Sequence, residues 1–591
     1  MVTERGSLHR LRAGRADVGL LLVIAFAALV LLAGLGRLPL FGRDEALYAE
    51  AAREMHASGD WITPRVNGAD FFEKPPLYYW LAALSYTVLG ETPLAARLPA
   101  ALLGIFTVAV TATLVSRVWG RRAGILAALI LVTCPLVVMV ARMGIMDMPL
   151  TCLVALALLA YARWSRRGGL APAAAFGLLV GLAVLLKGLA GGLAPAIAIA
   201  HALVCRRTSP PLPLSARGEG AMTEHGRDDR KARGEVRNAR APTLSIALAL
   251  IVAMLVAAPW FVAMAARHGE GYTAVFFLRE HLLRMAKPMQ GHGGGVYYYV
   301  AWIAFAFFPW VAFLPAAFGR KPGQNDDQAF WRSLAIVWFL VVLIPFSLIK
   351  TKLPGYIVPL FPPMAMLVAA DLDRRLEAPG RAAWVAVIGG GAIFAVAFAL
   401  LPALAARLGQ RYDVSGAARL LVVPAAFWVG GYAASVSGGL RALAGRTRAA
   451  LAFMVTGQTI IIASLLIGML PALSPYLGGG PAHLARVAQR ELPDRQIVLY
   501  ETRPETVAFA LRRSVPVFSR NQKSELLAEM AKGPTALIAP LEERGFWQPL
   551  PHGRLWIRGL DVLLDAHALA AHGSDDVVEE SGAHDGGARG R

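Results

Sequence analysis

Three charged residues at the start of the polar stretch GRDEALYAEAAREMHASGDWITPRVNGADFFEKPPLYYW (42–80) are of types suited to group transfer. They are Arg43, Asp44 and Glu45, two carboxylates beside a guanidinium. A carboxylate can take a proton from an attacking group, and a guanidinium can hold an anionic one. The stretch is highly charged and lies between two apolar blocks, so it must sit at a membrane surface rather than in hydrocarbon. We therefore predict that Asp44 and Glu45 are catalytic and that Arg43 binds substrate.

A short helix over 45–57 should present these residues, and Gly59 lies just past its end. Apolar residues recur along it at three- and four-residue spacing: Leu47, Tyr48, Ala51, Ala52 and Met55. Asp44 would then stand at the N-cap, where its carboxylate accepts a backbone N–H. Capping alone is the structural alternative to catalysis for Asp44, and the two roles are compatible.

The same stretch closes on Glu73, Lys74, Pro75 and Pro76. Two prolines remove two backbone donors and disfavour helix in the residue before them, so they fix how Glu73 and Lys74 are presented. We predict that Lys74 binds a phosphate group and that Glu73 contacts substrate. The structural alternative for Lys74 is an interfacial lysine whose stem lies in the membrane while its ammonium reaches water.

Two later segments carry charge at the ends of apolar blocks. ARMGIMDMPLT contains Arg142 and Asp147, which we predict to bind substrate because an isolated surface ion pair would contribute little by itself. SLIKTKLPGYIVPLFPPMA contains Lys350, Lys352 and Tyr356. These lysines fall on the non-cytoplasmic side, against the usual bias of loop charge, and binding a phosphate would account for them.

Lys187, in LLKGLAGG, is a weaker case of the same kind. The run FFLREHLLRMAKPMQGHGGGVYYY adds His281 and Arg284 beside a glycine-rich turn, whose backbone N–H groups suit an anion. Arg284 is therefore a further candidate for binding phosphate. Glu73 and His281 are candidate ligands of a divalent metal, the one cofactor considered, although their spacing matches no diagnostic metal motif.

Composition places the chain among polytopic helical membrane proteins. Of its 591 residues, 56% are hydrophobic, and repeated apolar blocks are long enough to cross about 30 Å of hydrocarbon. The net charge of +20 comes from basic residues in short loops between these blocks, which is a topology signal and argues against nucleic acid as a partner. The spacing of the three cysteines predicts neither a disulfide framework nor a metal site.

About thirteen transmembrane helices are predicted, and residues 77–90 are left out because about fourteen residues suit a surface or re-entrant helix. The spans are 18–36, 97–118, 121–140, 148–164, 170–186, 189–205, 243–264, 297–316, 332–348, 353–370, 382–404, 417–435 and 449–470. With the N-terminus in the cytoplasm, every basic turn falls on the cytoplasmic side of the cell inner membrane. The outer side then receives the loop 37–96 and everything after about residue 471.

Three parts are predicted in the chain. Residues 1–470 form an all-α membrane domain, with a disordered cytoplasmic insertion at 206–242. Residues 471–565 alternate strand-like and helix-like runs, which predicts a small periplasmic α/β domain, and 566–591 read as a loose tail. The predicted strands are Ile497–Tyr500, Val515–Phe518 and Ala536–Ile538, and the predicted helices are 505–513 and 523–531.

The chain resembles the bacterial 4-amino-4-deoxy-L-arabinose lipid A transferases, and the wider dolichyl-phosphate-mannose-protein-mannosyltransferase-like clan, in five segments that occur in order. These are GRDEALYAEAAREM, FFEKPPLYYW with RLPAALLG soon after it, RMGIMDMPLT, EHLLR with YYY, and KTKLPGYIVPLFPPMA. The likeness covers about 18–470. It implies the C-type membrane glycosyltransferase fold and, as in that family, a periplasmic C-terminal domain.

The resemblance implies transfer of a sugar, 4-amino-4-deoxy-L-arabinose or a similar one, from undecaprenyl phosphate or another polyprenyl phosphate to lipid A or a related envelope acceptor. The family's catalytic aspartate corresponds to Asp44. Its contacts to the carrier phosphate correspond to Lys74 and Tyr356, with Arg284 as a third. The insertion at 206–242 and the short C-terminal domain do not match the aminoarabinose enzymes, which leaves the sugar and the acceptor open.

Three other functions stay as alternatives. An enzyme of the same fold could act on a protein or on an O-antigen-type glycan. A lipid or sugar transporter would be expected to have repeat-related halves and charge near the middle of its spans, and the sequence contains neither in evident form. A structural scaffold would leave the lysines of the outer side unexplained.

Overall fold

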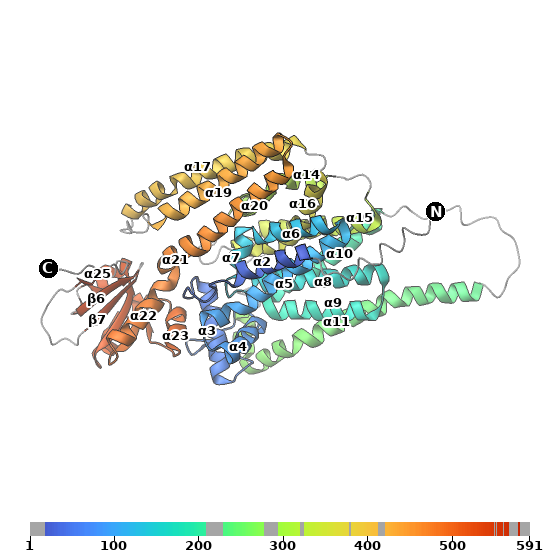
Figure 1. The fold of residues 1–591 in the computed structure, drawn as a ribbon. Helices are drawn as coiled ribbons and strands as arrows, with labels where there is room; N and C mark the ends of the chain where they lie inside the picture. The colour runs from blue at the N-terminus through green and yellow to red at the C-terminus, as the bar shows by residue number, and fades with distance from the viewer. Residues whose placement is uncertain are drawn as a thin grey trace.

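The computed structural model describes residues 18–208, 228–276, 293–319, 324–376, 380–411, 420–548, 550, 552–558, 561–566 and 577–578. These residues form a helical bundle with a small β-sheet domain at one end, beside α3 and α4 (Figure 1). The long helix α11 projects from the opposite end (Figure 1). The prediction of an all-α membrane protein with a small α/β domain at the C-terminal end is therefore confirmed.

The apolar blocks form helices because, in lipid, each backbone N–H and C=O must be bonded within its own segment. The first helices are α2 (Val18–Leu32), α3 (Arg43–Ser58), α4 (Leu77–Leu89), α5 (Pro93–Trp119), α6 (Arg121–Val132), α7 (Pro135–Ala141), α8 (Asp147–Arg167), α9 (Leu170–Lys187), η1 (Gly188–Gly192) and α10 (Leu193–Thr208). The later ones are α11 (Asp228–Thr273), α13 (Tyr298–Ala306), η4 (Trp310–Phe313), α14 (Leu314–Phe318), α15 (Asp326–Leu348), η5 (Pro354–Leu360), α16 (Phe361–Arg375), α17 (Arg381–Arg411), α19 (Val422–Leu443), α20 (Thr447–Ser464), η6 (Leu465–Met469), α21 (Leu470–Leu473) and η7 (Pro475–Gly479).

Within the described residues, eight helices are long and apolar enough to cross a membrane, and two pairs of helices bent by 70° and 108° raise this to ten. The sequence predicts thirteen, and the difference lies in three places. Helix α2 is only 15 residues long. Residues 170–205 count once although they contain α9, η1 and α10, and α19 falls outside the eight. The membrane-spanning character is confirmed, while the number thirteen stays a prediction.

Residues 228–242 correct one prediction. They form the first part of α11 instead of belonging to a disordered insertion, and 209–227 lie outside the described residues. Farther along, α11 packs closely against α9 because the latter carries glycines at the contact. A Cβ atom on Gly177 would lie 2.2 Å from the carbonyl oxygen of Ala249. Small residues at helix contacts are a common way for membrane helices to approach each other.

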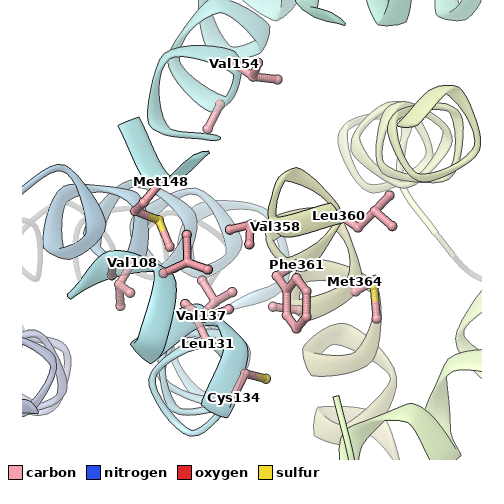
Figure 2. Close-up of a cluster of buried hydrophobic side chains, with 14 of the residues drawn as sticks. Val108, Leu131, Cys134, Val137, Met148, Val154, Val358, Leu360, Phe361 and Met364 are labelled. Carbon is pink, nitrogen blue, oxygen red and sulfur yellow. The ribbon is translucent and has the colours of Figure 1, made fainter. Parts of the chain in front are cut away.

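A cluster of buried hydrophobic side chains from α5, α6, α7, α8, η5 and α16 forms the core on which the candidate site rests (Figure 2). Met148 of α8 and Val358 of η5 are both about 1% exposed within it. Because Asp147 directly precedes Met148 and Tyr356 lies two residues before Val358, packing of this core holds the two polar residues near each other. A Cβ atom on Gly355 would lie 3.3 Å from Cγ of Asp147, so glycine permits the close approach.

Two glycines with positive φ set the ends of α3. Gly42 stands at the N-cap with φ of 80°, and Gly59 at the C-cap with φ of 72°, its N–H bonded to the carbonyl oxygen of Met55. The helix agrees with the predicted range 45–57. Asp44, however, is the second residue of the helix and makes no capping hydrogen bond, so the prediction that it is the N-cap is wrong. The glycine takes that place because it tolerates the left-handed backbone.

A short hairpin follows α3 and fastens the C-terminal domain to the outer loop. Its strands β1 (Arg65–Val66) and β2 (Ala69–Asp70) are antiparallel. They are joined by Asn67 and Gly68, whose φ values of 54° and 80° suit the tight turn of a hairpin. The Asn67 amide then exchanges two hydrogen bonds with the backbone of Val515: its Nδ2 donates at 3.0 Å and its Oδ1 accepts at 2.8 Å.

The C-terminal domain is a six-stranded mixed sheet in the order β4-β3-β5-β7-β6-β8. Its strands are β3 (Gln496–Tyr500), β4 (Val517–Phe518), β5 (Thr535–Pro540), β6 (His552–Arg558), β7 (Asp561–Ala566) and β8 (Val577–Val578). Its helices are α22 (Gly480–Glu491), α23 (Pro504–Leu511), η8 (Arg520–Gln522), α24 (Lys523–Met530), η9 (Leu541–Glu543) and α25 (Arg544–Trp547). β3 pairs in parallel with β4 and β5, while β7 pairs antiparallel with β5 and β6. The three predicted strands are confirmed, and β6 to β8 are additional.

Arg97 of α5 and Glu45 of α3 form a buried ion pair that joins the outer loop to the bundle. Nε and Nη2 of Arg97 donate to the two carboxylate oxygens of Glu45 at 2.8 and 2.9 Å. Its remaining N–H groups donate to backbone carbonyls of the turn after α2, those of Leu35, Leu38 and Pro39, at 2.8 to 2.9 Å. All five guanidinium N–H groups are therefore used, which is the condition for burying an arginine without a large cost.

Glu45 is equally saturated. In addition to Arg97, its carboxylate accepts the backbone N–H of Phe41 at 3.0 Å and that of Gly144 at 2.8 Å, and the residue is fully buried. No lone pair faces a substrate, so the prediction that Glu45 is catalytic is wrong. It holds three separate segments together. The sequence signal for its partner is the arginine of RLPAALLG, which stands near the start of an apolar block.

Replacing Arg97 by methionine should lower the free energy of unfolding by about 3–5 kcal/mol, because Glu45 would be left charged and buried. The measurement is the midpoint of thermal unfolding in detergent. Arg117→Met, at the other end of the same helix, removes an exposed arginine and should change stability by less than about 0.5 kcal/mol. The double variant Glu45→Leu with Arg97→Met should recover part of the loss. Equal midpoints of thermal unfolding for Arg97→Met and Arg117→Met would contradict a stabilising role of the buried ion pair.

Candidate active site

Asp44 lies in the first turn of α3, half-buried, and makes no hydrogen bond or ion pair with any described residue. One turn later, Tyr48 is buried. Burial, and then the carboxylate of Asp44, hold the pKa of the Tyr48 hydroxyl well above its usual value, and the charges of Asp147 and Glu73 act in the same direction. The charges of three carboxylates from three separate segments therefore act on this hydroxyl. The sequence predicted each of them separately, and the fold brings them together.

The segment Glu73-Lys74-Pro75-Pro76 stands directly before α4, as the sequence predicts. Nη2 of Arg43 lies 3.9 Å from Oε1 of Glu73, and Nζ of Lys74 donates to the backbone carbonyl of Glu73 at 3.0 Å. The beginning of the polar stretch 42–80 thus meets its later part, so that the guanidinium of Arg43 and the ammonium of Lys74 both lie near Glu73. Such a pair of cations suits an anionic group between them.

Asp147, Lys187 and Tyr356 form the other half of the site. Nζ of Lys187 lies 2.7 Å from Oδ1 of Asp147 and 4.9 Å from the centre of the Tyr356 ring. They come from the start of α8, the end of α9 and η5. We predicted Lys187 from the sequence only as a weaker candidate, yet in the structure it contacts both other members of this group. The ion pair uses one of the three N–H donors of the lysine, and the ring face supplies a second favourable contact.

Arg142 makes no ion pair with Asp147, and its predicted contact with substrate stays a prediction. Its Nη1 and Nη2 donate to the carbonyls of Val30 and Ala33 at 2.7 and 2.8 Å, at the C-terminal end of α2. A cation is favoured there because the last carbonyls of a helix have no partner within it. Burial, followed by the charge of Arg97, lowers the pKa of Arg142 to about 10, so it stays cationic at neutral pH.

Lys352 has a structural partner in place of a phosphate. Its Nζ donates to the carbonyls of Phe346, Ser347 and Ile349 at 3.2, 2.7 and 2.7 Å, which uses all three donors at the end of α15. Burial, and then the charge of Lys350, lower its pKa. The prediction that Lys352 binds phosphate is therefore wrong. Lys350 is exposed and has no ion pair with a described residue, so its prediction stays open.

Arg284 and His281 lie outside the described residues, so their predicted roles in binding phosphate and metal stay predictions. Among the residues that the structure does describe, no group of three or more His, Cys, Asp or Glu side chains could hold a metal ion. Glu73, the other predicted metal ligand, faces Arg43 across 3.9 Å.

The C-terminal domain contributes a carboxylate that sequence reasoning missed. Glu505, in the first turn of α23, is 4% exposed. Burial raises its pKa, while the nearby charge of Arg43 lowers it and that of Glu73 raises it. No local motif marks this glutamate, because its relation to the outer loop depends on how the domain packs against α3.

An apolar groove of about 680 Å³ is lined in part by residues that neighbour these polar groups in the sequence. It is lined by α4, α5, α8 and α9, and contains Leu77, Pro149 and Leu186. Leu77 follows Lys74 by three residues, and Leu186 directly precedes Lys187. An apolar groove whose lining neighbours two lysines in the sequence would suit a lipid whose head carries an anion.

Lys352→Met should leave three carbonyls at the end of α15 without their donor and lower the free energy of unfolding by about 1–3 kcal/mol. The thermal midpoint in detergent measures this. Lys350→Met is the matched control, since its exposed ammonium has no ion pair with a described residue, and its midpoint should equal that of the wild type. A Lys352→Met protein as stable as that control would return Lys352 to the group of anion-binding candidates.

Sequence comparisons agree with the motif-based resemblance. A family model described as dolichyl-phosphate-mannose-protein mannosyltransferase matches residues 73–213. Proteins named undecaprenyl phosphate-alpha-4-amino-4-deoxy-L-arabinose arabinosyl transferase are similar as well. That of Pectobacterium carotovorum subsp. carotovorum (strain PC1) is 31% identical over 60% of each chain. That of Pseudomonas paraeruginosa (strain DSM 24068 / PA7) is 32% identical, also over 60% of each. The chain thus spans about three-fifths of the length of the curated relatives it matches.

Solved structures extend the likeness to nearly the whole chain. The crystal structure of ArnT from Cupriavidus metallidurans bound to undecaprenyl phosphate is 23% identical and has a TM-score of 0.71, covering 94% of this chain and 100% of that one. The apo structure has a TM-score of 0.69 and covers 94% and 99%. The resemblance read from the motifs is confirmed: the protein has the fold of ArnT and is similar in sequence to the arabinosyl transferases over three-fifths of its length.

Proposed function

We propose that the protein is an integral membrane glycosyltransferase that moves a sugar from a polyprenyl-phosphate donor to lipid A or a related envelope acceptor. The observation that carries the proposal is the Asp147–Lys187 ion pair against the Tyr356 ring, together with the charges of Asp44, Asp147 and Glu73 that act on one buried tyrosine, Tyr48. Leu77 and Leu186, which follow Lys74 by three residues and directly precede Lys187, line an apolar groove. Support comes from the fold, which matches a protein solved with undecaprenyl phosphate. The names of the relatives favour 4-amino-4-deoxy-L-arabinose as the sugar.

In this proposal, the donor phosphate lies near Lys74, Lys187 and Tyr356, and the polyprenyl chain occupies the groove that starts at Leu77. Breaking the bond from the anomeric carbon to the phosphate oxygen leaves both electrons on the phosphate. Cations held in place beforehand stabilise this developing charge without reorganising solvent. Lys187 suits the task because the ion pair with Asp147 uses only one of its donors. Arg284 and Lys350 are further candidates.

The role of Asp44 depends on the acceptor. As the bond to the phosphate breaks, an acceptor oxygen bonds to the anomeric carbon from the opposite face, which inverts the configuration there. A hydroxyl acceptor would need Asp44 as the base that takes its proton. A phosphate monoester of lipid A has a second pKa near about 6 and is already a nucleophile at neutral pH. Asp44 would then orient the reacting groups or stabilise positive charge at the sugar carbon.

The loop charges support a placement in the inner membrane with the N-terminus cytoplasmic and the site and C-terminal domain periplasmic. A donor and an acceptor that are both lipids would meet at that outer surface. An acceptor of another kind, a protein or an O-antigen-type glycan, would use the same donor chemistry. Mass analysis of lipid A from cells with and without the gene separates these acceptors, because only lipid A transfer adds a pentose-sized group to it.

Asp44→Asn should leave the protein folded and reduce transfer by about two or more orders of magnitude, the usual scale for losing a positioned acid or base. Folding should survive because the side chain has no hydrogen bond or ion pair with a described residue, and only its favourable charge in the first turn, about 0.3–1 kcal/mol, is lost. The measurement is transfer in proteoliposomes with equal amounts of each protein. Asp494→Asn, on the exposed surface of the C-terminal domain, is the matched control. A wild-type rate for Asp44→Asn would remove the central residue of the proposal.

Lys74→Ala should raise the apparent KM for the polyprenyl-phosphate sugar and also lower kcat, because its charge acts on the bound and the departing phosphate. Lys74→Arg tests the geometry, since a planar guanidinium need not replace a compact ammonium held before two prolines. Its activity should lie between those of the wild type and Lys74→Ala. Lys532→Ala replaces an exposed lysine just after α24 and should leave both KM and kcat unchanged. An unchanged KM and kcat in Lys74→Ala would exclude this lysine from the donor site.

A further inference from the structure

A cavity of about 430 Å³ lies between the first helix of the bundle, α2, and the end of the last, α20, and shares no lining residue with the groove described above. Its walls are the end of α2, residues of α7, and α20 with the turn and helix that follow it, which are neighbours in Figure 1. At its edges Leu29 and Ile467 are 64% and 78% exposed. In a membrane these edges face hydrocarbon, so the cavity would be open to lipid from the side.

The lining is amphipathic along the axis of α2. Its inner part is apolar and includes Leu29, Ile462 and Leu466. Its outer end carries three guanidinium groups, those of Arg37, Arg97 and Arg142, and no carboxylate belongs to the lining. The volume is within the range of sites that hold small molecules or parts of them. Apolar walls with cations at the outer end match the build of a lipid, with chains below and a charged head above.

Only one of the three arginines has its charge fully compensated. Arg97 is saturated by Glu45 and three backbone carbonyls. Arg142 makes two hydrogen bonds, both to carbonyls of α2, which leaves three of its five N–H groups without an acceptor in the described structure. Arg37 is exposed and makes no side-chain hydrogen bond or ion pair with a described residue. Two positive charges in the cavity lining are thus not paired with a carboxylate of the described residues.

We propose that this cavity binds an anionic phospholipid of the surrounding bilayer, with its phosphate against Arg37 and Arg142 and an acyl chain between α2 and α20. The guanidinium of Arg142, although bonded to two carbonyls, still has N–H groups that can donate to a phosphate. Hydrogen bonds between an arginine and a phosphate are charge-assisted and therefore strong. A zwitterionic lipid would leave the excess positive charge uncompensated. The proposal does not depend on glycosyl transfer, because it rests on the cavity and its arginines alone.

The test is a titration of delipidated protein in detergent, followed by the midpoint of thermal unfolding. Phosphatidylglycerol should raise the midpoint of the wild type, whereas phosphatidylcholine with the same chains and inorganic phosphate should not. Each arginine near an anionic headgroup contributes about 1 kcal/mol, so Arg37→Gln should raise the lipid concentration for half-maximal protection about fivefold. Ala463→Trp, which fills the cavity from α20, should abolish protection while keeping both arginines.

Arg37→Gln is the main variant because the exposed side chain can be replaced without disturbing the fold, whereas Arg142 also caps α2. Arg486→Gln, an exposed arginine of α22 outside the cavity, is the matched control and should respond like the wild type. Equal protection by phosphatidylcholine, or an unchanged response of both Arg37→Gln and Ala463→Trp, would overturn the proposal. Protection by purified lipid A and not by phosphatidylglycerol would also overturn it and assign the cavity to an acceptor.

Discussion

The buried ion pair between Glu45 and Arg97 is the interaction on which the arrangement of the site depends. Taking two charges out of water is costly unless every hydrogen bond is made, and here each carboxylate oxygen accepts two and each guanidinium N–H donates. The partners belong to the turn after α2, to α3 and to the segment before α8. The pair therefore fixes the direction of the first turn of α3. Asp44, one residue earlier, takes its position from this pair and needs no hydrogen bond of its own.

Cations on the predicted outer side of the membrane divide into two kinds. Arg97 and Lys352 give every N–H group to backbone carbonyls or to a buried carboxylate. Such residues donate hydrogen bonds to backbone carbonyls at or after helix ends, which would otherwise have no partner away from water. Their position against the usual bias of loop charge therefore has a structural cause. Lys187 instead keeps donors beyond its one carboxylate partner. The side on which a cation lies is thus a poor guide to function, and the number of its donors already used is a better one.

Much of the fold follows from local pattern, whereas the pairing of charges does not. The residue spacing and Gly59 predict α3 within two residues of its observed ends, and short apolar runs predict β3 and β5. The predicted ends of other helices differ by more, as for α15, which begins at Asp326 and not at residue 332. The EKPP segment also stands where its prolines place it. The partners Glu45 and Arg97 are 52 residues apart, and Asp147 and Lys187 are 40 apart. No periodicity joins residues at such distances, because helix packing decides which side chains meet.

The C-terminal domain is built into this arrangement. The carbonyl of Leu477, just after α21, accepts the N–H of Gly42 at 2.9 Å, directly before the first turn of α3. Asn67 binds Val515 at the other side of the loop, and Glu505 faces the charge of Arg43. The segment that ends at Leu477 begins in α20, one wall of the proposed lipid cavity. A lipid held there would contact α20, which leads along the chain to Leu477 and, through its hydrogen bond, to Gly42 directly before Arg43. Contiguous networks of packed and bonded residues of this kind carry coupling between sites. The membrane itself would then help to set the position of the turn that carries Asp44.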